Sequence, residues 1–252
     1  MLLGWGRAIL LQLAHPLVAA GVSEHSTFRG GPLTAVARLH QTVRAMLALT
    51  FGDPRASAAA IDGIRTIHRR VHGTLPDAAG RFAAGTPYSA EDPDLLLWVH
   101  ATLLDSIPLV FDRVVRPLSD HERDRYCDEA AWVAIALGAR EAEVPRTWDA
   151  LRAYLAATYA SGSIAVSAEA REVATAVLAP PLASLVAPMT WANRLVTVGL
   201  LPAHVRQQYG FDWTPARERS LGRVLRLTAG VRAVTPRALA WWPEARTTML
   251  RP

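Results

Sequence analysis

The chain has 252 residues, of which 51% are hydrophobic and 19% charged, so it can bury a substantial core in one large domain or two small ones. Its formal net charge is +5, and every basic residue is an arginine because the sequence contains no lysine. The arginines are interleaved with acids, as in residues 122–125, which disfavours the basic stripe of a nucleic-acid-binding protein. A single cysteine, Cys127, excludes an intrachain disulfide and a multi-cysteine metal centre.

Membrane helices need about 20 consecutive apolar residues, and we find no such stretch free of charge. The nearest approach is the N-terminal segment 1–22, which is interrupted by Arg7, Gln12, His15 and Pro16. It also lacks the basic start and the clean apolar block of a secretory signal. We therefore expect a buried helix of a cytoplasmic protein without an integral membrane segment.

The spacing of apolar residues predicts an all-α fold. They recur every three or four positions between glycine and proline punctuation, whereas period-two alternation is almost absent. We expect one globular multi-helix domain over residues 1–232 and a loosely organised tail over 233–252, docked through Trp241 and Trp242. The expected helices are, in chain order, residues 4–21, 33–51, 54–72, 91–115, 119–138, 145–159, 167–178, 181–198, 202–208 and 214–232.

Several of these helices carry boundary signals. Start signals are Asp53-Pro54, Ser119 followed by Glu122, Pro145, and Thr214-Pro215. Stop signals are Gly52, Gly73 and Gly138. The segment 73–90 between two helices is the longest irregular piece, and a loop of that length is typical of one that covers a pocket.

Four helical segments place polar side chains in otherwise apolar surroundings. They contribute, in chain order, Gln12, His15, Glu24 and His25; Arg38, Gln41 and Thr42; Arg65, His68 and His72; and Trp98, His100 and Asp105. Spacings of three and four residues put the members of the second and third groups on one helical face each. Such convergent polar groups indicate a pocket.

Each group also has a structural interpretation. His15 before Pro16 and His100 in an apolar helix fit hydrogen-bonded core histidines. A solvated stripe would account for Arg38 and Thr42 equally well. His68 and His72 are spaced for a metal, but the H-E-x-x-H pattern is missing, and histidines also suit helix C-termini. The residues alone therefore predict an α-helical protein with a polar pocket.

The ordered blocks GRAILLQLAHPLVAAGVSEHSTF, ARLHQT, FGDP, IHRRVHG and YSAEDPDLLLWVHATLLDS resemble the MpaB/latex clearing protein family of oxygenases. The later blocks ERDRYCDEAAWVAIALGA and LLPAHVRQQYGFDW continue the resemblance, which covers roughly residues 4 to 225. It implies a globin-like helical core with additional helices and one non-covalent haem b. It also implies a reaction of dioxygen with an apolar, isoprenoid-like or secondary-metabolite substrate.

The resemblance assigns roles to individual residues. The H-x-x-V-[RH] motif of the family makes His68 the proximal iron ligand, and Arg65 is then placed to pair with a haem propionate. The R-x-x-x-T motif matches Arg38 and Thr42, near the haem. Trp98 and His100 fall where the family places further pocket residues, so the resemblance makes them cofactor-binding candidates.

This chain departs from its rubber-cleaving relatives on the oxygen side, the side of the haem where dioxygen is expected to bind. Those proteins carry a lysine just before the threonine, whereas Gln41 stands there in this chain. We therefore expect a substrate other than rubber, with Arg38, Gln41 and Thr42 shaping the oxygen side. Glu24 is our candidate for a base that removes an allylic proton from the substrate.

Two alternative functions stay open at this point. One is a haem or hydrophobic-ligand binding protein without turnover, which would use the same pocket. The other is a non-haem metal enzyme built on His68, His72 and either His100 or Glu24. The sequence indicates neither the oligomeric state nor the product.

Overall fold

The structure, a computed structural model, describes residues 2–25, 32–178, 187–236, 242, 243 and 245, with side chains left out for residues 2, 3 and 32–40. Its helices are α1 (Leu2–Leu13), α2 (Pro16–His25), α3 (Pro32–Phe51), α4 (Pro54–His68), α5 (Pro93–Val114), α6 (Asp120–Leu137), α7 (Trp148–Ala160), α8 (Ala168–Leu178), α9 (Ala187–Gly199), α10 (Ala203–Gln208) and α11 (Pro215–Val234). A short 3-10 turn, η2 (Glu141–Glu143), and two strands, β1 (His72–Thr74) and β2 (Pro87–Ser89), complete the described elements. The predicted all-α class is confirmed.

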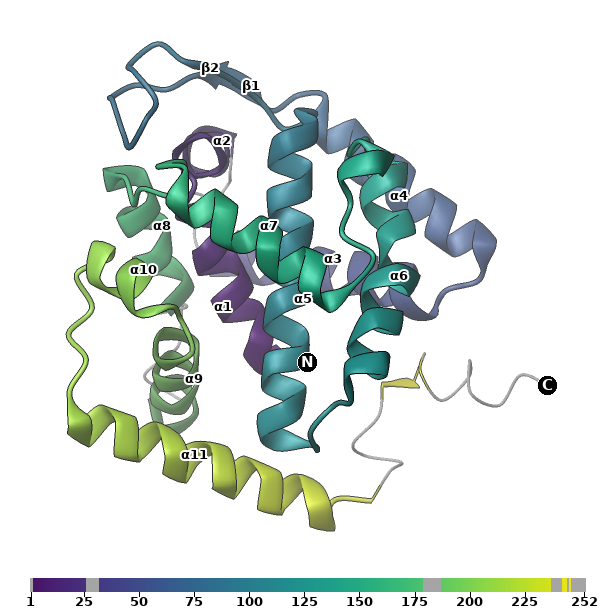
Figure 1. Cartoon of the computed structure of the whole chain (residues 1–252), viewed down its shortest axis with the longest axis vertical. Coiled ribbons are helices and arrows are strands. Elements are labelled where there is room, and N and C mark those ends of the chain that lie inside the picture. Colours follow the sequence, from purple (N-terminus) through teal and green to yellow (C-terminus); the bar gives the residue numbers. More distant parts are fainter. Residues whose placement is uncertain (1, 26–31, 179–186, 237–241, 244, 246–252) are drawn as a thin grey trace.

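Helix α5 runs through the middle of the molecule and packs against α1, α6, α7 and α11 (Figure 1). Its side chains Trp98, Ala101 and Leu104 join the largest buried cluster, together with α1, α7 and α8. By length and composition α5 is a candidate membrane span, with a mean hydropathy of 1.4, but 61% of that window is buried inside the fold. A core helix gives the same signal.

The predicted helix 4–21 is wrong, because the structure divides it into α1 and α2 at Ala14 and His15. The residue before a proline is disfavoured in the helical region, and Pro16 follows directly. Pro16 then serves as the first residue of α2, where its missing N–H costs nothing. The carbonyl freed at Ala14 accepts a hydrogen bond from the backbone N–H of Ala165 at 2.9 Å.

The predicted helix 54–72 is correct at its start and wrong at its end. Asp53 caps α4 by accepting a hydrogen bond from Ala56 N at 2.8 Å. The helix stops at His68, and His72 lies in β1, so His72 does not share a helical face with Arg65 and His68. Gly73 is likewise a strand residue and not a helix stop, since it pairs with Tyr88 of β2.

The segment 73–90 is therefore partly ordered as a hairpin, which the search for strand signals missed. Its strands are short, and the register pairs His72 with Ser89 and Thr74 with Pro87. A Cβ at Gly73 would lie 2.7 Å from the Tyr88 hydroxyl, so glycine is what lets the tyrosine cross the hairpin. Three-residue strands fall below what a period-two pattern can reveal.

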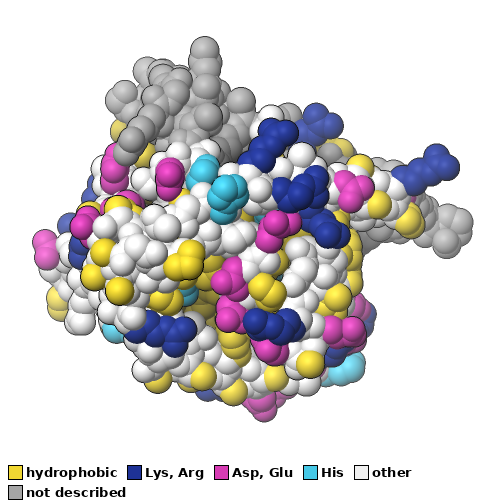
Figure 2. Space-filling view, turned by 90° about the horizontal axis from the view of Figure 1, so that it is seen from above, with side chains coloured by type: hydrophobic (Ala, Val, Ile, Leu, Met, Phe, Trp, Pro, Cys, Tyr) yellow, Lys and Arg dark blue, Asp and Glu magenta, His cyan; other side chains and the backbone are white. Residues whose placement is uncertain are grey.

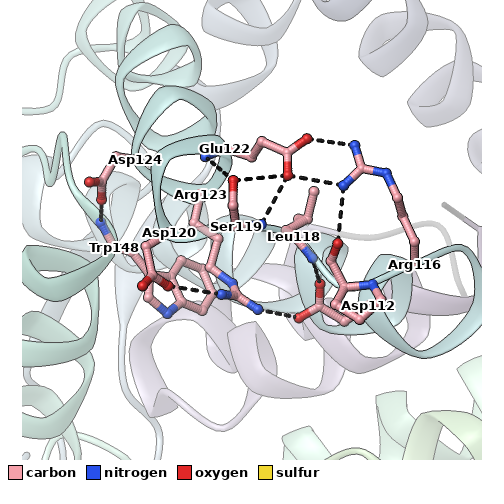
Figure 3. Close-up of polar contacts among 10 residues, drawn as sticks. Asp112, Arg116, Leu118, Ser119, Asp120, Glu122, Arg123, Asp124 and Trp148 are labelled. Carbon is pink, nitrogen blue, oxygen red and sulfur yellow. Dashed lines mark hydrogen bonds and ion pairs between the residues drawn. The ribbon is translucent and has the colours of Figure 1, made fainter.

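The corner between α5 and α6 is held by polar contacts that the sequence predicted in part (Figure 3). Ser119 and Glu122 form a reciprocal capping box at the start of α6. Arg123 pairs with Asp112 at 2.7 Å and thereby ties α6 back to α5. The other end of α6 stops at Gly138, whose φ of 120° is the left-handed conformation expected of a helix-ending glycine.

Helix α11 lies across one end of the molecule, against α9 and the last turns of α5 (Figure 1). Leu221 and Leu225 of α11 pack there with Val110 and Val196. The hairpin lies at the opposite end (Figure 1). The globin-like arrangement, the domain boundary at residue 232 and the cytoplasmic location stay predictions. Trp241 lies outside the described residues, and Trp242 is half-buried.

Candidate functional site

Helix α4 presents one continuous face to a groove between α3, α4 and α6. The groove has a volume of about 750 Å³, within the usual range of small-molecule sites. Ile61 and Arg65 line it from α4, Leu49 from α3, and Trp132 from α6. Ile61 and Arg65 precede His68 by seven and three residues, so His68 continues the same face at the end of the helix.

His68 is half-buried, and its Nδ1 atom is buried without a hydrogen-bond partner among the described residues. Burial lowers the pKa of His68 below its usual value, while the charge of Glu91 opposes the shift. The imidazole is therefore neutral at pH 7 and keeps a lone pair available for a ligand. An axial histidine is expected to donate from its second nitrogen to a carbonyl or carboxylate, and the described residues provide no such acceptor at Nδ1.

Two further histidines share this property. His100 on α5 is buried with Nε2 unpaired, and burial alone lowers its pKa to about 4. His15, in the break between α1 and α2, is buried with Nδ1 unpaired and has a pKa lowered to about 4, chiefly by burial and then by Arg81. The sequence interpretation of both as hydrogen-bonded core histidines is therefore incomplete, because each keeps one unsatisfied ring nitrogen.

Glu24 is an exposed residue near the end of α2, beside the hairpin. The hydroxyl of Tyr88 donates a hydrogen bond to Glu24 Oε2. Burial, followed by this hydrogen bond, raises the pKa of Tyr88 well above its usual value, so the tyrosine remains a donor at neutral pH. The neighbouring His25 Nε2 lies 3.0 Å from the carbonyl oxygen of His72. The candidate base is thus held by the hairpin, and Tyr88 is a site residue that sequence reasoning missed.

The oxygen-side candidates lie on α3. Gln41 and Thr42 are exposed side chains in the middle of that helix. Arg38 belongs to the same helix, but its side chain lies outside the described residues. The structure therefore places all three on one helix that packs against α4, as their spacing predicted, and leaves their roles as predictions.

Trp98 is placed differently from the other candidates. It is 1% exposed in the main core, its indole N–H donates to the carbonyl oxygen of Gln12 at 3.4 Å, and its ring meets Tyr159 edge-on. Of the predicted site residues with described side chains, only Arg65 is among those that line the groove; those outside the lining are Glu24, Gln41, Thr42, His68, Trp98 and His100. The groove residues Ile61 and Trp132 were not predicted, although the seven-residue spacing from Ile61 to His68 was a signal for the first of them.

The sequence of the chain matches a known enzyme family. The chain matches, over residues 1–233, the family model described as "ER-bound oxygenase mpaB/B'/Rubber oxygenase, catalytic domain". The chain belongs to this family. No curated protein and no solved structure matches it. Membership in the mpaB/rubber oxygenase family makes this an oxygenase-type domain, for which a small-molecule substrate and dioxygen are the expected partners.

We tested whether the residues of this mpaB/rubber oxygenase domain fit a haem. A single axial histidine is enough to hold haem iron, and His68 offers a half-buried, neutral imidazole at the end of α4. Arg65 lines the adjoining groove and has the bidentate geometry that suits a carboxylate such as a propionate. The donor set and the largely apolar walls of the groove fit the group.

Proposed function

We propose that this protein is a haem b-dependent oxygenase that acts on an apolar small molecule, with His68 as the protein ligand of the iron. The observation that carries the proposal is the half-buried, neutral imidazole of His68, which continues the helical face whose earlier residues Ile61 and Arg65 line the groove. Membership in an oxygenase family supports the reaction class. The substrate class rests on the resemblance to isoprenoid-cleaving relatives.

Each candidate residue has its own role in the proposed function. His68 holds the cofactor from the end of α4, and burial keeps its imidazole neutral. Arg65, three residues earlier, pairs with a propionate. When bound, the haem supplies the activation of dioxygen. Arg38, Gln41 and Thr42 on α3 shape the oxygen side and offer hydrogen-bond donors to developing negative charge.

Glu24 removes a proton from the substrate in this scheme. The hydrogen bond from Tyr88 fixes one carboxylate oxygen, so that the other is oriented for proton transfer. Tyr88 is therefore proposed as the residue that positions Glu24.

A non-haem metal site built from the same side chains has less support. Across the described ranges, no three His, Cys, Asp or Glu side chains come together as a possible metal site. His72 in particular lies on β1 and not one turn beyond His68 on α4. A porphyrin, which itself supplies four nitrogen ligands, needs no such cluster.

The test is the absorption spectrum of the purified protein after haem supplementation, for the wild type, His68→Ala and His72→Ala. His72 is a matched control, because it is an exposed histidine four residues away. We expect a Soret band in the wild type and in His72→Ala, and loss or a clear shift of that band in His68→Ala. A colourless wild type, or an unchanged spectrum in His68→Ala, would refute the proposal.

Dioxygen uptake with isoprenoid-type substrates separates an enzyme from a carrier. A protein that binds haem through His68 and consumes no dioxygen with any such substrate would be the non-catalytic binding protein. Metal analysis distinguishes the non-haem alternative, which one iron or zinc per chain without porphyrin would favour.

A further inference from the structure

A surface far from the haem site exposes apolar side chains without an evident partner. Seven large hydrophobic residues are exposed in the described part of the chain, and five of them lie on α9 or α11: Met189, Trp191, Leu227, Val231 and Val234. The other two, Ile67 and Trp132, lie on α4 and α6. Apolar exposure at this density is a mark of an interaction surface.

The apolar residues of α11 form a stripe on its outer side. Leu227 is 69% exposed and Val234 is 82% exposed, and with Val231 they follow one another at spacings of four and three residues. The inner side of the helix is already occupied by Leu221 and Leu225, which are buried against α5 and α9. The stripe is therefore not the core-facing side of the helix.

Trp191 of α9 extends the stripe across a shallow groove of about 200 Å³. The groove is lined by Trp191, Ser220, Arg223, Val224 and Leu227. Trp191 is 55% exposed, so a large aromatic ring and an aliphatic side chain face solvent from two neighbouring helices. We call Trp191, Leu227, Val231 and Val234 the α11 stripe.

Arginines flank the α11 stripe. Helix α11 carries five of them, Arg217, Arg219, Arg223, Arg226 and Arg232, and one acid, Glu218. Glu218 is engaged, since its carboxylate accepts a hydrogen bond from the indole N–H of Trp213 at 2.7 Å. Within the described residues no carboxylate pairs with Arg219, Arg223 or Arg226. The face is thus both apolar and strongly basic.

The opposite end of the molecule shows a different distribution. Viewed from the hairpin side, the surface mixes arginines with acidic side chains, and no large area carries a single sign (Figure 2). Some surface arginines elsewhere are paired, as Arg146 is with Asp128 at 2.9 Å and Arg125 with Glu129 at 2.7 Å. Others, such as Arg65, Arg70 and Arg152, are exposed and have no ion pair among the described residues. What distinguishes the α9–α11 end is that unpaired arginines lie there beside five of the seven exposed large hydrophobic residues of the described chain.

Charge decides which occupant fits this face. A second copy of the chain, docked symmetrically, would bring the same arginines against one another. Nucleic acid would match the arginines but would leave the apolar stripe without a partner. An anionic lipid surface matches both, because arginines contact headgroup phosphates while apolar side chains enter the headgroup–acyl boundary.

We propose that the α9–α11 end of this protein binds the surface of an anionic membrane. Trp191, Leu227, Val231 and Val234 enter the boundary region, and Arg219, Arg223 and Arg226 contact lipid phosphates. The helix lies on the membrane and does not cross it. This inference is independent of the haem proposal and would bring the enzyme to the phase in which apolar molecules dissolve.

The test is co-sedimentation with vesicles of phosphatidylcholine, with and without phosphatidylglycerol. We expect binding that requires phosphatidylglycerol and weakens as sodium chloride is raised. Arg219→Glu combined with Arg223→Glu should lower the partition coefficient by about tenfold or more, since each arginine near such a surface contributes about fivefold. Leu227→Asp combined with Val231→Asp should reduce binding to a comparable extent.

Matched controls come from α7, which lies away from α11. Arg152 and Ala156 are exposed there, so Arg152→Glu and Ala156→Asp change charge and polarity as much per site and should leave binding unchanged. Circular dichroism and thermal melting confirm that each variant is folded. Equal binding of all variants, or equal binding to vesicles lacking phosphatidylglycerol, would overturn the proposal.

Two further experiments test whether a second copy of the chain or nucleic acid binds the α9–α11 end instead. Sedimentation equilibrium that shows a dimer lost in Leu227→Asp and Val231→Asp, without vesicle binding by the wild type, would assign the face to a second copy. Retention of the wild type by a mixed-sequence DNA duplex, without vesicle binding, would assign it to nucleic acid. Either result replaces the membrane proposal.

Discussion

Two sets of polar side chains lie in the interior of this protein, and they are satisfied to very different extents. Arg7 on α1 is 4% exposed and has three partners: Asp105 Oδ2 at 2.6 Å, Ser106 Oγ at 2.7 Å and the carbonyl oxygen of Leu200 at 2.7 Å. The histidines His15, His68 and His100 instead each keep one buried ring nitrogen that has no partner within the described part of the chain.

The difference separates structural groups from candidate ligand groups. A buried charge with a full set of partners ties together the elements that supply them, here α1, α5 and the residue that follows α9. A buried imidazole nitrogen without a partner costs stability and persists where a ligand completes it.

Removing Arg7 should have the largest effect. We expect Arg7→Ala to lower the free energy of unfolding by about 3 kcal/mol or more, because it strands the carboxylate of Asp105 in a partly buried place. Urea denaturation measures the change, with Arg152→Ala on the surface of α7 as the control. The double variant Arg7→Met with Asp105→Leu should recover much of the loss.

Acidification should destabilise the fold through the buried histidines. His15 and His100 have pKa values near 4 in the folded protein, below the usual 6.5. The unfolded chain takes up these protons first, so stability is intact above about pH 6.5 and is lost as the pH falls towards about 4. Each histidine contributes up to about 3 kcal/mol to that loss. Urea midpoints measured across this range should fall steadily.

Substituting His100 by leucine should not lower the free energy of unfolding, in contrast to the substitution of Arg7. An apolar side chain of similar volume removes the unpaired Nε2, so we expect His100→Leu to leave the haem-free protein equally stable or about 1–2 kcal/mol more stable at pH 7. The variant should also lose less stability than the wild type as the pH falls from about 6.5 to about 4. A large destabilisation at pH 7 would show that His100 has a structural partner.

The smallest effect is expected at the capping box of α6, whose polar groups are hydrogen-bonded but exposed to solvent. Ser119→Ala removes the side chain that accepts from the Glu122 backbone, and we expect a loss of about 0.5–1 kcal/mol. The small size follows from the access of water to the freed N–H. Thermal melting resolves it, and Ser119→Asp, which restores a capping acceptor, should recover most of the loss.

Much of the candidate site was predictable because it lies on one helix. Ile61, Arg65 and His68 share a face through helical periodicity alone, and the family resemblance selected His68 from two candidate histidines. The selection of His68 over His72 stays a prediction; in the structure α4 ends at His68 and His72 lies in β1. The partner of Glu24 was not predictable, because Tyr88 reaches it only through a hairpin with three-residue strands.

The sequence by itself determined the helical class, most helix boundaries and the oxygenase family. These follow from local periodicity, capping residues and the order of the motifs, all of which are written within short segments. The tertiary structure decided which buried polar atoms find partners and which do not. Partners for Arg7 come from residues 99 and 193 positions away, and only packing brings such residues together.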